Sequence, residues 1–151
     1  ASGSKGIGCD MISNEEREFV LRRPLGHLGT ADAGAAPHVM PVCFALEAEE
    51  IFIPIDEKPK GGDIRRLKRL RNIADNPRVC LMVDRYDPDW SGLGWVMLRG
   101  AAAIKERAAD RAGAIELLRA RYVQYQSMDL ETRPLIVIRV DNVSSWGDLS
   151  R

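Results

Sequence analysis

Short strand-like apolar runs joined by tight turns set the strongest limit on how this chain of 151 residues can fold. Asp32-Ala33-Gly34 and Glu49-Glu50 each supply a turn between two such runs. Strands joined by so few residues pair antiparallel, because a parallel pair needs a crossover of about a dozen residues or more. A doubly wound parallel sheet is therefore disfavoured.

The apolar pattern predicts six strands and three helices in the order α-β-β-β-α-β-β-α-β. Ser13 and Glu16 have the spacing of a capping box, which begins a first helix that Pro24 ends. Two further helices are expected over 63–75 and 110–125. The expected strands are Gly26–Ala31, His38–Glu47, Ile51–Ile55, Arg78–Tyr86, Trp95–Lys105 and Pro134–Val143. We therefore expect a mainly β fold with helices, of the α+β class: a small six-stranded antiparallel barrel with helices at its ends.

Length and composition indicate one globular domain. The chain has 45% hydrophobic and 29% charged residues, which are ordinary globular proportions. We expect residues 13–151 to form a single domain and residues 1–12 to be a disordered leader or the remnant of an expression tag. No apolar run approaches the ~20 residues of a membrane span, and no secretory signal is recognisable. We therefore expect neither a membrane protein nor a secreted one.

The cysteines indicate a reducing environment. Cys9, Cys43 and Cys80 are an odd number, and none belongs to a C-x-x-C pair. Cys43 and Cys80 lie inside apolar, strand-like runs, where a buried reduced thiol is expected. A disulfide framework is therefore not expected, and a cytoplasmic location fits.

A cluster of basic residues is the strongest indication of function. Seven lysines and arginines and only one acid fall between Lys58 and Arg71, in a chain whose formal net charge is zero. On a helical wheel, Arg66 and Arg69 flank the apolar stripe and can reach a ligand held between this helix and the barrel. Lys58 and Lys60 precede the helix start, whose free N–H groups also favour anions. The stretch is either an anion-binding site or a solvated helix face.

Other classes of function lack a recognisable pattern. The basic stretch contains no aromatic residue that could stack on bases, so nucleic-acid binding is not expected. His27 and His38 are too few and too badly spaced for a metal site. No nucleophile motif or catalytic carboxylate pair stands out, so no catalytic residue is predicted. An enzyme of this kind must take its chemistry from a cofactor.

The three tryptophans are a second indication of a binding site. Trp90 and Trp95 flank a loop that contains glycine, and Trp146 follows the last strand. Tryptophans in such positions either line a slot for a flat ring or pack at the rim of the core.

Six segments in fixed order resemble a known family. They are GHLGTA at 26–31, PHVMPVCF at 37–44, DEKPK at 56–60, RNI-x-x-NPRV at 71–79, WVMLRGA at 95–101 and SWG at 145–147. Together they resemble the pyridoxamine 5′-phosphate oxidase-like split β-barrel proteins, and within them the actinobacterial branch associated with the deazaflavin coenzyme F-420. The resemblance extends from about Glu16 to Gly147.

This resemblance implies a homodimer with two cofactor sites at the subunit interface. The flat cofactor ring is expected against the second and third strands, at Met40, Val42, Cys43, Ile55 and Asp56. The anionic part of the cofactor is expected on Lys58, Lys60, Arg66 and Arg69. Trp95 and Trp146, donated across the dimer or from the same subunit, would wall the pocket.

Two positions favour the deazaflavin over flavin mononucleotide (FMN). Relatives that bind FMN usually carry Lys where Arg69 stands and Ser or Thr where Leu67 stands. Arg69 keeps the role of a phosphate ligand, whereas Leu67 lacks the hydroxyl. The longer basic track with Lys58 and Lys60 suits a coenzyme tail that carries several negative charges.

The resemblance and the charge pattern together predict an oxidoreductase that transfers hydride between coenzyme F-420 and a small conjugated or unsaturated substrate. Two alternatives remain open: an FMN-dependent oxidase or reductase of the same fold, and a non-catalytic protein that holds the coenzyme or a tetrapyrrole. Oxidation of pyridoxamine phosphate is not expected, because no Arg/His pair of the required kind lies near the C-terminus. The sequence does not indicate the substrate.

Overall fold

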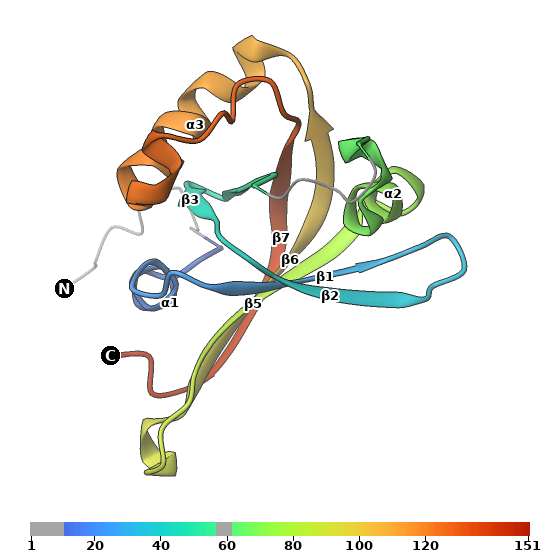
Figure 1. The fold of residues 1–151 in the computed structure, drawn as a ribbon. Coiled ribbons are helices and arrows are strands. Elements are labelled where there is room, and N and C mark those ends of the chain that lie inside the picture. Colours follow the sequence, from blue (N-terminus) through green and yellow to red (C-terminus); the bar gives the residue numbers. More distant parts are fainter. Residues whose placement is uncertain (1–10, 57–61) are drawn as a thin grey trace, which may run out of the picture.

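The computed structural model describes residues 11–56 and 62–151 (Figure 1). The predictions made for residues 1–10, Lys58 and Lys60 fall outside this described part of the chain. Ile12 is fully buried and packs in the main core, so the core already includes the residue that precedes the Ser13 helix cap.

Seven antiparallel strands form one sheet that curls into a half-barrel (Figure 1). Their spatial order is β2-β1-β5-β6-β7-β4-β3, and neighbouring strands run antiparallel throughout. The predicted antiparallel α+β fold class is therefore confirmed, with one more strand than expected. The strands are β1 (Gly26–Ala31), β2 (Pro37–Val42), β3 (Ala45–Glu47), β4 (Glu50–Pro54), β5 (Arg78–Arg85), β6 (Gly94–Lys105) and β7 (Leu135–Gly147).

Helices flank the curled sheet. The α-helices are α1 (Asn14–Leu21), α2 (Lys68–Asp75) and α3 (Ala108–Arg121), and the 3₁₀ turns are η1 (Ile64–Arg66), η2 (Trp90–Gly92) and η3 (Val123–Gln126). The helix α2 contacts β1 and β6, whereas α3 contacts β3 and β4 (Figure 1). The predicted capping box at the start of α1 forms, with both reciprocal hydrogen bonds between Ser13 and Glu16. No helix within the described ranges is long and apolar enough to cross a membrane.

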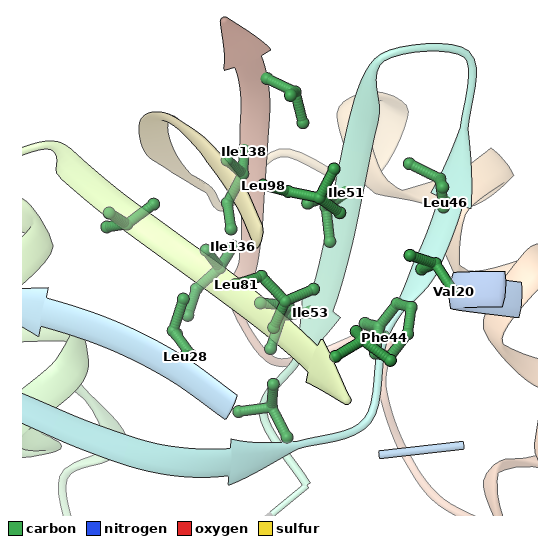
Figure 2. Packing of buried hydrophobic residues seen from close by; sticks show 14 of the residues in the cluster. Val20, Leu28, Phe44, Leu46, Ile51, Ile53, Leu81, Leu98, Ile136 and Ile138 are labelled. Carbon is green, nitrogen blue, oxygen red and sulfur yellow. The ribbon is translucent and has the colours of Figure 1, made fainter. Parts of the chain in front are cut away.

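The main hydrophobic core lies inside the curl of the sheet (Figure 2). Five of its side chains come from five different strands and are at most 1% exposed: Leu28, Ile53, Leu81, Leu98 and Ile136. Full burial of one such side chain stabilises the fold by about 1.5–3 kcal/mol. A second cluster joins α3 and η3 to the sheet and includes Ile115, Leu118, Tyr122, Tyr125, Leu130, Leu135 and Val137.

The extra strand arises because the predicted strand over 38–47 is split into β2 and β3. Between them, the Phe44 N–H donates to the Tyr122 hydroxyl at 3.0 Å instead of to a strand. The same hydroxyl lies 3.0 Å from the Phe44 carbonyl oxygen and 2.8 Å from that of Pro24. A side chain 78 residues away in the sequence therefore interrupts the ladder at this point.

The helix predicted over 63–75 is also interrupted. Asp63 caps only the short turn η1, and Leu67 then adopts an extended conformation (φ −57°, ψ 132°) before α2 begins. A single helical wheel over 63–75 therefore misplaces the side chains, because the helix is not continuous across Leu67. Arg69 is consequently buried, at 4% exposure, whereas Arg66 is exposed.

A bulge bends the two longest strands. The pairing of β6 with β7 runs from Gly94 to Lys105 and shifts register between Arg99 and Gly100. A methyl group at position 100 would lie only 2.0 Å from the carbonyl oxygen of Arg139 on β7. Because this neighbour is backbone, only glycine fits at the bend.

The substitution Gly100→Ala tests this bend. The added methyl group must force β6 away from β7, so we expect the free energy of unfolding to fall by about 2–3 kcal/mol. Urea denaturation followed by circular dichroism measures the change. The matched control is Gly113→Ala on α3, where a methyl group would meet nothing within 4 Å; this variant should gain about 0.5–1 kcal/mol. Equal stability of the two variants would contradict the strain at Gly100.

Candidate functional site

Two adjoining hollows lie where the ends of β2 and β4 meet α2 and η3. The smaller one, about 170 Å³, is called the arginine lobe and is lined by Leu25, Pro41, Val42, Cys43, Pro54, Asp56 and Arg69. The larger one, about 460 Å³, is called the tyrosine lobe and is lined by Pro24, Leu25, Cys43, Asp56, Tyr122, Gln124, Tyr125 and Met128. Leu25, Cys43 and Asp56 belong to both lobes, so the two together form one cleft.

A larger hollow in the described part of the chain lies elsewhere. It has about 700 Å³ and lies between α3 and the strands β3 and β4, among Glu47, Glu50, Asp110 and Glu116. It contains none of the predicted cofactor residues. A hollow with such an acidic lining disfavours an anionic cofactor, so size does not identify the site here. The cleft is the better candidate because charge, aromatic rings and predicted residues converge on it.

The arginine lobe carries one buried cation. Arg69 comes from the first turn of α2 and lines the lobe at 4% exposure, while Leu70 and Ile73 of the same helix pack in the main core. One turn further on, Asn72 donates from Nδ2 to the Thr30 hydroxyl at 3.0 Å, which fixes α2 against β1. A guanidinium held in this way can bind phosphate or carboxylate through charge-assisted hydrogen bonds.

The tyrosine lobe carries a carboxylate–phenol pair. The Tyr125 hydroxyl donates to Oδ2 of Asp56 at 2.5 Å, and the Tyr125 ring packs at 5.2 Å from that of Tyr122. Burial and then the hydrogen bond to Asp56 raise the pKa of Tyr125 well above its ordinary value. The phenol therefore stays protonated and acts as a fixed hydrogen-bond donor.

Three arginines hold the frame of the cleft by binding backbone carbonyls. Arg119 donates to the carbonyls of Tyr125 and Met128, both at 3.0 Å. Arg133 donates to the carbonyl of Ile55 at 2.9 Å, immediately before Asp56. The third, Arg121, donates to the carbonyls of Leu21 and Arg23 and to the Tyr122 hydroxyl. The loops around the cleft are thus fixed by side chains from α3 and the segment that follows it.

The structure brings four of the predicted site residues together at the cleft: Val42, Cys43, Asp56 and Arg69. The other predicted site residues that the structure describes do not line it. Met40 is half-buried on β2, Ile55 is fully buried, and Arg66 is exposed on η1. Trp95 and Trp146 face each other across β6 and β7, and Trp146 is 54% exposed.

Sequence reasoning missed the tyrosine lobe. The helix expected over 110–125 includes Tyr122 and Tyr125 in its last turn and assigns them no role in a site. In fact α3 ends at Arg121, and both tyrosines follow it, on and just before η3. The available indication of the tyrosine lobe was the presence of two tyrosines three residues apart. Each carries a hydroxyl that must find a hydrogen-bond partner when the ring is buried.

Comparisons with known proteins identify the family. The family model for pyridoxamine 5′-phosphate oxidase matches residues 12–147. The chain therefore belongs to the pyridoxamine 5′-phosphate oxidase family, as the six sequence segments suggested. The predicted split-barrel fold is shared by the protein Rv2991 of Mycobacterium tuberculosis, with a TM-score of 0.71 at 19% identity over 95% of this chain and 90% of that one.

Three further matches concern redox chemistry and tetrapyrroles. A 5a,11a-dehydrotetracycline/5a,11a-dehydrooxytetracycline reductase of Streptomyces rimosus is 33% identical over 73 residues, 48% of this chain and 49% of that protein, so the match spans about half of that relative. A solved F-420 reductase has a TM-score of 0.59 at 25% identity, covering 84% of this chain and 94% of that one. A heme-binding protein of Mycobacterium smegmatis has a TM-score of 0.69 at 19% identity, covering 92% of this chain and 56% of that one.

The ion pair between Arg119 and Glu131 makes the frame of the tyrosine lobe sensitive to acid. Hydrogen bonds from Arg119 hold the pKa of Glu131 at about 2, below its ordinary 4.5. The contribution of Glu131 to stability is therefore complete above pH ~4.5 and is lost as the pH falls through about 2. We expect Glu131→Gln to show a smaller loss of stability between these limits than the unmodified protein.

Urea denaturation at neutral pH and near pH ~3 measures this difference. Glu116→Gln, on the exposed face of α3, is the control and should behave as the unmodified protein does. If Glu131→Gln kept the full acid sensitivity, the ion pair would not stabilise η3.

Proposed function

We propose that this protein is an oxidoreductase that uses the deazaflavin coenzyme F-420 to reduce a small conjugated or unsaturated substrate. The observation that carries the proposal is the convergence of Val42, Cys43, Asp56 and the buried Arg69 on one cleft. These are the positions at which the family resemblance expects the cofactor ring and its anionic group. The F-420 reductase among the structural neighbours and the reductase among the relatives support this choice.

In this proposal Arg69 binds the first anionic group of the coenzyme. Lys58 and Lys60, which lie outside the described residues, and the exposed Arg66 extend the positive charge along the tail. The ring lies against Val42 and Cys43, where β2 ends and the ladder is interrupted. Met40 is half-buried on the same face of β2 as Val42, and Ile55 is buried in the main core next to Asp56.

A second copy of the chain would complete the site. Val39 on the outer face of β2 is 64% exposed, and Trp146 on β7 is 54% exposed. Covering these apolar side chains in a homodimer removes them from water. It also allows Trp95 and Trp146 of one protomer to wall the cleft of the other. Reduced cysteines are consistent with a cytoplasmic setting for such a dimer.

When bound, the coenzyme would supply the hydride that reduces the substrate, and solvent would supply the proton once the product leaves the cleft. The chain itself provides binding, orientation and exclusion of water. Arg69 holds the anionic group at one end, and the tyrosine lobe offers a partly apolar space beside the ring. Asp56 lies between these two parts and is fixed by Tyr125.

A second candidate is a protein that binds FMN or a tetrapyrrole on the same fold. The family resemblance favours the flavin, and the heme-binding neighbour favours the tetrapyrrole. The absorption spectrum of the purified protein separates them: bound flavin is yellow, and bound heme gives an intense Soret band. Tight binding of either, with no binding of coenzyme F-420, would contradict the proposal.

The substitution Arg69→Met tests the anion site. Removal of a charge-assisted hydrogen bond costs about 1.5–3 kcal/mol, so the affinity for coenzyme F-420 should fall about tenfold or more. The fluorescence of the coenzyme, titrated with protein, measures the dissociation constant, and circular dichroism checks the fold. Arg71→Met, an exposed position on the same helix, is the matched control and should change the affinity less than threefold. Unchanged affinity in folded Arg69→Met would refute the anion site.

A further inference from the structure

Asp56 occupies the wall shared by the two lobes of the cleft. Its carboxylate is half-buried, lines both lobes, and accepts a hydrogen bond from the Tyr125 hydroxyl. A carboxylate offers acceptor sites for about four hydrogen bonds. Tyr125 fills one of them on Oδ2. The carboxylate is therefore positioned to accept a further hydrogen bond from a molecule in the cleft.

The rest of the tyrosine lobe is suited to a flat ring. Pro24, Leu25 and Met128 contribute apolar walls, and Tyr122 adds an aromatic ring to that of Tyr125. A volume of about 460 Å³ accommodates a small ligand of two or three fused rings. Among the described residues that line the lobe, Asp56 carries the one carboxylate. A flat apolar ligand with one hydrogen-bond donor at its edge would match this arrangement.

The carboxylate is held from both sides. Arg119 fixes the backbone of Tyr125, and the raised pKa of that phenol keeps it a donor toward Asp56. Arg133 fixes the carbonyl of Ile55, the residue before Asp56. The position and orientation of the carboxylate are thus set before any ligand arrives, which lowers the cost of ordering it on binding.

We propose that Asp56, positioned by Tyr125, selects the substrate by accepting a hydrogen bond from a hydroxyl or enol group at the edge of a flat conjugated ring in the tyrosine lobe. This inference rests on the proposed function and adds the substrate class: hydroxylated or enolic fused rings. Substrates with a carboxylate or phosphate at that edge are disfavoured, because their charge would face that of Asp56.

A pair of probes that differ by one donor tests the inference without the coenzyme. 2-Naphthol can donate a hydrogen bond to Asp56, whereas 2-methoxynaphthalene has nearly the same shape and cannot. We expect the protein to bind 2-naphthol about tenfold more tightly, as measured by the fluorescence of each probe. Asp56→Asn should reduce this preference to less than threefold, because the amide presents N–H groups and a weaker acceptor.

Two further variants complete the experiment. Tyr125→Phe keeps the ring and removes the hydroxyl that orients Asp56, so an intermediate preference is expected; this variant also serves if Asp56→Asn does not fold. Asp75→Asn changes an exposed carboxylate at the end of α2 and should keep the full preference. Equal affinity for the two probes in the unmodified protein, or an unchanged preference in folded Asp56→Asn, would overturn the inference.

The probe experiment and the coenzyme titration test different claims, so one can fail while the other succeeds. If the protein prefers 2-naphthol through Asp56 but does not bind coenzyme F-420, the recognition element stands and the proposed cofactor is wrong. If it binds the coenzyme through Arg69 but does not distinguish the probes, the proposed function stands and the role of Asp56 is wrong.

Discussion

The pairing of β6 with β7, bent at Gly100, is the constraint on which the rest of the structure depends. In the sheet order β2-β1-β5-β6-β7-β4-β3, this pair lies between β2 at one edge and β4 near the other. The cleft is nevertheless lined by the end of β2 and the end of β4 together. A strongly curled sheet brings these two ends to the same cleft. The close approach of Gly100 to the β7 backbone is therefore a condition for the site as well as for the fold.

The polar groups of the cleft are fixed by a layer of arginines around it. Arg119, Arg121 and Arg133 bind backbone carbonyls of segments that are far apart in the sequence. A guanidinium presents five donors in one plane, so a single side chain can satisfy several carbonyls that no strand or helix pairs. This arrangement lets irregular loops form a rigid wall. It also explains how Asp56 and Tyr125 keep fixed positions in a cleft that is lined largely by irregular segments.

Much of the fold could be predicted from local patterns in the sequence. Short turns required antiparallel pairing, and the spacing of Ser13 and Glu16 gave the first helix start. Of the two arginines that the basic stretch singled out, Arg69 lines the cleft, whereas Arg66 lies outside it because of the break at Leu67. The partners that Tyr122 and Tyr125 find, Phe44 and Asp56, and the resulting split of β2 from β3 were not predictable. Both depend on tertiary contacts across about 70–80 residues, which no local pattern records.

A crystal structure of the protein with coenzyme F-420 bound tests the central claim most directly. The ring should lie against Val42 and Cys43 beside Asp56, with its first anionic group on Arg69 and a second protomer closing the cleft. A ring bound at another surface, or a coenzyme tail that makes no contact with Arg69, would contradict the assignment of this cleft as the cofactor site.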